Sequence, residues 1–142
     1  MDVKALIQNK GTGYWLCAAA SACALVVGII VLATQGMALT VDVAGQGWTV
    51  SVMLFIGFAV NVVLTFFPMR FASAVSVLFY SIAFGFAINL APGAIADQIN
   101  QVHYQGGDFG MTMFYVISTF IIAALCIVAC FFAQTKNGKA VL

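Results

Sequence analysis

The stretch Phe67-Pro68-Met69-Arg70-Phe71 separates two long apolar segments and contains the only arginine of the chain. Proline suits the first turn of a new helix and cannot continue the interior of an old one. A linker as short as this one makes the two flanking helices antiparallel neighbours. The stretch therefore predicts a helical hairpin with Arg70 at its corner.

The composition of the chain points to a membrane. Of its 142 residues, 64% are hydrophobic and 6% are charged, whereas an average soluble domain has about 25% charged residues. A soluble core of this length cannot hide so much apolar surface, so lipid is the expected solvent. The net charge of +1 creates no extended field that would attract nucleic acid. We therefore expect the lipid bilayer as a partner and no nucleic acid.

Four uncharged apolar segments are each about as long as the ~20 residues that cross the hydrocarbon core of a bilayer. The expected spans are 14–34, 48–67, 71–91 and 111–133. A cleaved signal peptide is the alternative for the first segment, but that segment is longer than the apolar part of a signal peptide. We expect an all-α polytopic membrane protein with one domain, 1–142, formed by four transmembrane helices in an antiparallel bundle.

Residues 94–104 have a different pattern. Ile95, Ile99 and Val102 recur at helical spacing with polar residues between them, which predicts a short amphipathic helix. The segment is too short and too polar to span, so it should lie along the outer membrane surface or cap the bundle. Its polar side consists of Asp97, Asn100, Gln101 and Tyr104. This side is either an ordinary solvated face or a contact surface for a protein or for lipid headgroups.

The basic residues predict the orientation in the membrane. All 5 of them lie in segments that four spans place on the same side, namely Lys4, Lys10, Arg70, Lys136 and Lys139. The two longer loops contain aspartates and no lysine or arginine. Because basic residues near span ends stay in the cytoplasm, we expect both termini to be cytoplasmic in a cell membrane. The basic side chains then serve as topology anchors.

The predicted spans contain no Asp, Glu, Lys, Arg or His. Ionisable residues inside a membrane mark proton relays, voltage sensors and ion-coupled sites. Their absence argues against a pump or a proton-coupled transporter, and the small multidrug transporters, which also have four spans, depend on a glutamate that this chain lacks. The loops show no clustered acids, no histidine pair and no metal motif. We therefore expect no catalytic residue, no cofactor and no enzyme activity.

Small and polar residues recur along the third span. Ser73, Val77, Ser81, Gly85 and Asn89 are spaced four apart, which places them along one stripe of a helix. We expect Asn61 and Thr65 of the second span to face this stripe. The stripe is either a surface for helix packing, since small residues let membrane helices approach closely, or a polar track for a neutral solute or an anion.

The first span has a small-residue stripe of its own, formed by Ala20, Ala24 and Gly28. It predicts a close helix contact within the bundle, with a dimer face as the alternative. In the third span Tyr80 lies far from both ends, and its hydroxyl needs a partner in hydrocarbon. We expect Asn61 to be that partner.

All 4 cysteines lie in apolar segments, at Cys17, Cys23, Cys126 and Cys130. As small apolar residues they suit a membrane core. Cys17, Cys126 and Cys130 are expected at a similar depth, so a soft-metal or redox site is the alternative. Because a zinc site usually has four ligands, we expect no metal.

Two short motifs carry a resemblance to a known group of proteins. They are Ile7-Gln8-Asn9-Lys10-Gly11-Thr12-Gly13-Tyr14-Trp15 and Asn100-Gln101-Val102-His103-Tyr104-Gln105-Gly106-Gly107. The chain resembles small four-span membrane proteins of Gram-positive gut bacteria over most of its length. The resemblance implies a bacterial cytoplasmic membrane and implies no activity.

These observations favour a non-enzymatic scaffold or accessory subunit that packs against itself or against another membrane protein. One alternative is an oligomeric pore or uncoupled carrier for a neutral solute or an anion, lined by the uncharged polar residues. Another is an enzyme or lipid-handling protein that works at the outer surface. A pore requires the stripe of residues 73–89 to line a hydrated gap.

Overall fold

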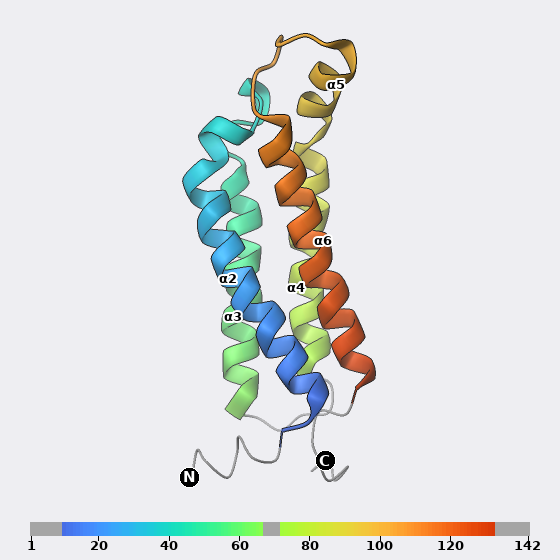
Figure 1. The fold of residues 1–142 in the computed structure, drawn as a ribbon. Helices are drawn as coiled ribbons and strands as arrows, with labels where there is room; N and C mark the ends of the chain where they lie inside the picture. Colours follow the sequence, from blue (N-terminus) through green and yellow to red (C-terminus); the bar gives the residue numbers. More distant parts are fainter. Residues whose placement is uncertain (1–9, 67–71, 133–142) are drawn as a thin grey trace.

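The computed structural model of the chain describes residues 10–66 and 72–132. Within these ranges the secondary structure is helical. The elements are α2 (Thr12–Ala38), the 3-10 turn η1 (Val41–Val43), α3 (Gly47–Phe66), α4 (Ala72–Leu90), α5 (Pro92–Asn100) and α6 (Phe109–Phe131). The predicted all-α fold is confirmed (Figure 1).

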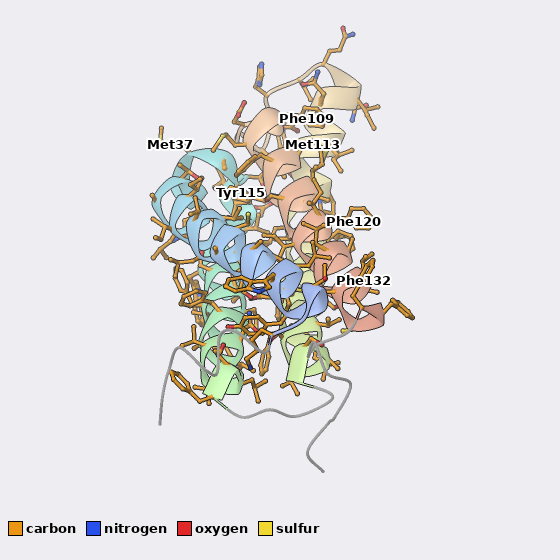
Figure 2. All side chains as sticks on the ribbon, turned by 60° about the horizontal axis from the view of Figure 1, so that its bottom comes forward. Met37, Phe109, Met113, Tyr115, Phe120 and Phe132 are labelled. Carbon is orange, nitrogen blue, oxygen red and sulfur yellow. The ribbon has the colours of Figure 1, made fainter. Side chains whose placement is uncertain are left out.

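Four helical segments are long and apolar enough to cross a membrane. In the most apolar window of each segment only 22% to 39% of the residues are buried inside the bundle. Most apolar side chains therefore point outward, where lipid provides an apolar environment for them. Figure 2 shows this directly for Phe120 and Phe132, which point away from the bundle. The chain is a multi-pass integral membrane protein.

The four long helices form a ring in which α2 and α4 each pack against α3 and α6. The start of α2, the end of α3, the start of α4 and the end of α6 meet at one end of the bundle (Figure 1); we call this the basal end, and the opposite end the cap end. As predicted, α3 and α4 are antiparallel neighbours. The hairpin corner that predicted this pairing, Phe67 to Phe71, lies outside the described residues.

The small residues of the first span hold α2 close to α3. Ala20, Ala24 and Gly28 are all buried. A Cβ atom on Gly28 would lie 2.8 Å from the ring of Phe55, and the Ser51 hydroxyl donates to the Gly28 carbonyl at 2.9 Å. The predicted contact within the bundle is therefore present, and the alternative of a dimer face does not apply to this stripe.

Helix α2 extends to Ala38, beyond the expected end of the span at residue 34. Tertiary contacts hold this extra turn. The Tyr115 hydroxyl lies 2.7 Å from Thr34 Oγ1, and the Ala38 carbonyl accepts from the Thr112 hydroxyl at 2.8 Å and from the Asp108 amide at 3.0 Å. Figure 2 shows Tyr115 directed toward the interior. A polar, glycine-containing stretch is thus helical because α6 supplies partners for it.

The short helix α5 follows α4 after a single break at Ala91 and rises beyond the cap end as an extension of α4 (Figure 1). The expected helix at 94–104 exists, but it begins at Pro92 and ends at Asn100, and it does not lie across the bundle. Gln101 terminates it in the left-handed conformation, with a φ of 53°. The backbone at Ala91 stays in the helical region, so proline at the first turn causes only a local break.

Candidate functional site

A group of polar side chains lies in the interior of the basal half. It comprises Cys17 and Ser21 of α2, Asn61 of α3, Tyr80 of α4 and Cys126 of α6, all of them buried. We call this group the basal polar cluster. Because each of the four spanning helices contributes to it, the cluster depends on the assembled bundle and on no single pair of helices.

Ser21 is the shared acceptor of the cluster. The Tyr80 hydroxyl donates to Ser21 Oγ at 2.8 Å, and the Asn61 amide group donates to the same oxygen at 2.6 Å. The expected bond between Tyr80 and Asn61 is therefore wrong, because both residues donate to Ser21 instead. Tyr80 reaches Ser21 across the diagonal of the helix ring, since α4 and α2 are not adjacent.

A glycine of α3 makes room for this crossing. A Cβ atom on Gly57 would lie 2.5 Å from Cε1 of Tyr80, which is closer than two carbon atoms can approach. Gly57 is therefore required for the position of the Tyr80 ring. The aromatic ring can then pass α3 and bring its hydroxyl to α2.

Two thiols extend the cluster toward α6. The Cys17 thiol donates to Asn61 Oδ1 over a long 3.8 Å, and the sulfur atoms of Cys17 and Cys126 lie 3.5 Å apart. Because the single proton of Cys17 is directed to Asn61, Cys126 is the donor between the two sulfurs. Donation therefore runs from Cys126 to Cys17, from Cys17 to Asn61, and from Asn61 to Ser21.

A second group of polar contacts lies at the basal, C-terminal end of α3. The Lys10 ammonium donates to the Thr65 carbonyl at 3.0 Å and lies 4.7 Å from the centre of the Tyr14 ring. The Thr65 hydroxyl donates to the Asn61 carbonyl at 2.9 Å and lies 3.1 Å from the Tyr14 hydroxyl. A cation at the last carbonyls of a helix is favourable. Lys10 thus caps α3 in addition to its expected role as a topology anchor.

The environment of Lys10 also affects its titration. The side chain is buried, and this burial lowers the pKa of the Lys10 ammonium from its usual value. The other expected anchors, Lys4, Arg70, Lys136 and Lys139, lie outside the described residues.

The predicted stripe on α4 does not lie on one side of the bundle. Ser73 is buried and accepts from the Cys130 thiol at 3.4 Å, whereas Ser81, Gly85 and Asn89 are exposed. Residues four apart on an α-helix advance by about 40° per step, so the stripe winds from the interior to the outside. The expected contact of the stripe with Asn61 and Thr65 is not formed; Asn61 bonds to α2, and Thr65 lies beside Tyr14.

The four residues of the predicted contact face on α5 do not share one role. The Asp97 carboxylate accepts from the backbone N–H of Gln105 at 2.8 Å, so it holds the following loop. Gln101 ends the helix, and the Asn100 side chain donates to the Ala96 carbonyl at 2.9 Å. Tyr104 is 89% exposed. Asp97 and Gln101 therefore shape the chain, and Tyr104 is the member of this set that is most available for contact.

The cap end also carries an apolar groove between α4, α5 and α6. Its volume is about 400 Å³, and its walls include Ile88, Ile95, Ile99, Met113 and Val116. Met113 lies at the cap end of α6 (Figure 2). The groove borders the exposed face of α5, and its lining offers hydrocarbon contacts and no reactive group.

Sequence reasoning missed Ser21, Gly57 and Ser76. Ser21 could have been found, because it lies four residues after Cys17 in an otherwise apolar stretch. Gly57 and Ser76 carried no signal of their own. The Ser76 side chain is buried, and its hydroxyl has no hydrogen-bond partner among the described residues.

Metal chemistry would need more ligands than the described part of the chain brings together. Residues 10–66 and 72–132 contain no group of three or more His, Cys, Asp or Glu side chains that could hold an ion. Comparison with known proteins found no match to the chain among protein families, curated proteins or solved structures.

Proposed function

We propose that the chain is a non-enzymatic scaffold or accessory subunit of a bacterial cell membrane that packs the outer face of α4 against another membrane helix. The observation that carries this proposal is the exposure of Ser81, Gly85 and Asn89 on a membrane-spanning segment. We call these three residues the α4 outer face. Its partner is a helix of a second copy or of another membrane protein.

The polar groups of this face have no side-chain hydrogen bond to any other described residue. Other hydroxyls that point away from the core behave differently; Ser118, for example, donates to the Phe114 carbonyl at 2.6 Å. In lipid, a hydroxyl or an amide without a partner favours helix association, because a neighbouring helix supplies the missing bond. The α4 outer face therefore has a reason to be covered that the other faces lack.

Gly85 strengthens this argument. A Cβ atom there would meet nothing within 4 Å, so the packing of the single bundle does not require a glycine at this position. Small residues spaced four apart let two membrane helices approach closely. Ser81, Gly85 and Asn89 have this spacing.

The interior supports a non-enzymatic role. The donors of the basal polar cluster bond to other members of the cluster. Donation begins at Cys126 and at Tyr80, and both routes end at Ser21. A fully connected buried network favours a single rigid packing arrangement. Such a rigid interior suits a protein that acts through contacts on its surface.

We further infer that the basal end is cytoplasmic. Lys10 lies at this end, and Asp42, Asp97 and Asp108 lie in or beside the loops of the cap end. Basic residues near span ends remain on the cytoplasmic side. The resemblance of residues 7–15 and 100–107 to bacterial proteins supports the bacterial membrane in this proposal.

An oligomeric pore or carrier is the second candidate, and it draws on the same exposed residues. Ser81 and Asn89 of several copies could surround a shared gap. Asn61 and Ser73 lie inside each bundle, so they would contribute only if the bundle opened. The two candidates therefore differ in whether the α4 outer face is dry or hydrated in the assembly.

The experiment compares Gly85→Leu with Gly36→Leu in native membranes. Gly36 is a matched control, because a Cβ atom there also meets nothing within 4 Å. We expect the unmodified chain and Gly36→Leu to purify in a complex larger than one chain, and Gly85→Leu to purify alone. Purification of the unmodified chain as a monomer from mild detergent and from native nanodiscs would contradict the proposal. Solute flux into liposomes that Gly85→Leu abolishes would favour the pore.

A further inference from the structure

Two thiols from opposite ends of the chain meet inside the membrane. Cys17 of α2 and Cys126 of α6 are separated by 109 positions in sequence, yet their sulfur atoms lie 3.5 Å apart. Both side chains are buried, whereas Cys23 and Cys130 are exposed. We propose that Cys17 and Cys126 form an intramembrane dithiol that a hydroperoxide oxidises to a disulfide, which links the first spanning helix to the last.

The geometry requires only a small movement. A disulfide bond is about 2.05 Å long, so the sulfurs must approach by roughly 1.5 Å. Helices at subunit interfaces shift by about 1–2 Å in allosteric transitions, and a movement of this size between the packed helices α2 and α6 is enough. Side-chain rotation and a slight helix shift together supply the approach.

The hydrogen bonds already orient the pair. The proton of Cys17 points to Asn61 Oδ1, so a lone pair of the Cys17 sulfur faces Cys126. The Cys126 thiol donates back toward this sulfur. Whichever sulfur is oxidised first, the other lies in contact with it and can react next.

The oxidation proceeds in two steps. One sulfur attacks the outer oxygen of the hydroperoxide, the O–O bond breaks, and an alcohol leaves with the thiol proton, so that a sulfenic acid remains. The second sulfur attacks the first, the S–O bond breaks, and the hydroxyl leaves as water with the second thiol proton. Two thiols lose two electrons in total, and the peroxide gains them.

The location selects the chemical class of the oxidant. Charged oxidants do not enter an apolar interior, because burying an unpaired charge is expensive. A hydroperoxide is uncharged and dissolves in hydrocarbon, and both products of the reaction are neutral. Cys23 and Cys130 have no second thiol in hydrogen-bond contact among the described residues, so Cys17 and Cys126 are the pair already placed for a direct bond.

The proposed disulfide changes the cluster in a defined way. An oxidised Cys17 has no thiol proton, so Asn61 Oδ1 loses its donor. The seam between α2 and α6 becomes covalent in the basal half. The oxidised chain should therefore resist full extension in detergent and migrate faster than the reduced chain on a non-reducing gel.

The test treats the full chain in phosphatidylcholine liposomes with cumene hydroperoxide, then alkylates the free thiols under denaturing conditions and maps the peptides. We expect a peptide that joins Cys17 to Cys126 as the main cross-linked product. Cys17→Ala and Cys126→Ala should abolish the gel shift. Cys23→Ala and Cys130→Ala are the matched controls and should keep it.

The peptide map of the unmodified chain decides the outcome even if a variant fails to fold. Full alkylation of both Cys17 and Cys126 after treatment, with Cys23 oxidised in the same sample, would overturn the proposal. A gel shift that survives Cys17→Ala would overturn it as well. Oxidised glutathione, which is charged, should produce no cross-link in intact liposomes.

Discussion

The Tyr80 hydroxyl donates to Ser21 Oγ at 2.8 Å across the diagonal of the helix ring. This bond joins α4 and α2, which are not among the closely packed pairs of spanning helices. It also brings a tyrosine hydroxyl and an asparagine amide to the same acceptor. The pair therefore links two opposite helices of the ring through its centre.

Tyr80→Phe removes the donor of this bond and keeps the aromatic ring. Hydrogen bonds between membrane helices contribute on the order of 1 kcal/mol, so we expect a loss of free energy of unfolding of about that size. Unfolding in mixed micelles by added sodium dodecyl sulfate measures it. Tyr104→Phe is the control, because Tyr104 is 89% exposed. Equal stability of the two variants would contradict a bond across the bundle.

Gly57→Ala places a methyl carbon 2.5 Å from Tyr80 Cε1, which is too close for two non-bonded carbon atoms. Overpacking of this kind costs about 1–3 kcal/mol. Gly36→Ala should be neutral or slightly stabilising, since that position is open. The effects of Gly57→Ala and Tyr80→Ala should be non-additive in a double-mutant cycle, because truncation of the ring removes the clash. Simple additivity would show that the two residues do not touch.

Ser76→Ala and Ser21→Ala should have opposite effects although both serines are buried. The Ser76 hydroxyl lacks a partner among the described residues, and burial of such a group costs about 1–3 kcal/mol. Its removal should leave the bundle as stable or more stable. Ser21→Ala leaves two donors without their acceptor and should destabilise. The same micelle titration compares them, and a larger loss for Ser76→Ala would refute this account.

Lys10→Met removes the hydrogen bond to the Thr65 carbonyl and also removes the cost of burying an ammonium, so it should change the pH dependence of stability more than the stability at neutral pH. Burial lowers the pKa of Lys10 in the folded chain below its usual value of 10.5. Between the lowered pKa and 10.5 the unfolded chain binds more protons, so unfolding becomes less favourable as pH rises through that window. Stability measured from neutral to alkaline pH should show this rise in the unmodified chain. Lys10→Met should lack the rise, and an identical slope in both would contradict the buried position of Lys10.

The proposed orientation is tested by cysteine labelling of intact cells. Ala44→Cys lies in the exposed loop after η1, and Gly138→Cys lies in the basic C-terminal segment. We expect an impermeant maleimide to label only the first, because the acidic loops face outward. The second should react only after permeabilisation. Labelling of both from outside would contradict a four-span topology with a cytoplasmic basal end.

The spans could be predicted because their length and composition are local properties. The observed α3 begins at Gly47 and α4 ends at Leu90, each one residue from the predicted bounds of 48 and 91; the other two bounds adjoin residues 67–71, which lie outside the described residues. The extension of α2 to Ala38 could not be predicted, since it depends on Thr112 and Asp108, which are remote in sequence.

The candidate site was predictable only in its residue types. Asn61, Tyr80 and the cysteines are conspicuous polar residues in apolar segments, so they attract notice in the sequence. Their partners depend on the rotation of each helix about its axis, and this rotation is set by all four helices together. The prediction that residues 73 to 89 of α4 share one side of the bundle was wrong for a related reason. Residues spaced four apart drift around the helix, so they do not stay on one face over the length of α4.

By itself the sequence determined that the chain is embedded in a membrane, that it has four spans, and that α3 pairs with α4. These properties follow from apolar length, charge and a short linker, and each acts within one segment or between two neighbours. Only the tertiary structure decided that Tyr80 bonds to Ser21, that Cys17 meets Cys126, and that Ser81 faces outward. In a membrane the lipid-facing side of a span can be as apolar as its inward side, so hydrophobicity does not select the inward face; close packing of the whole bundle selects it.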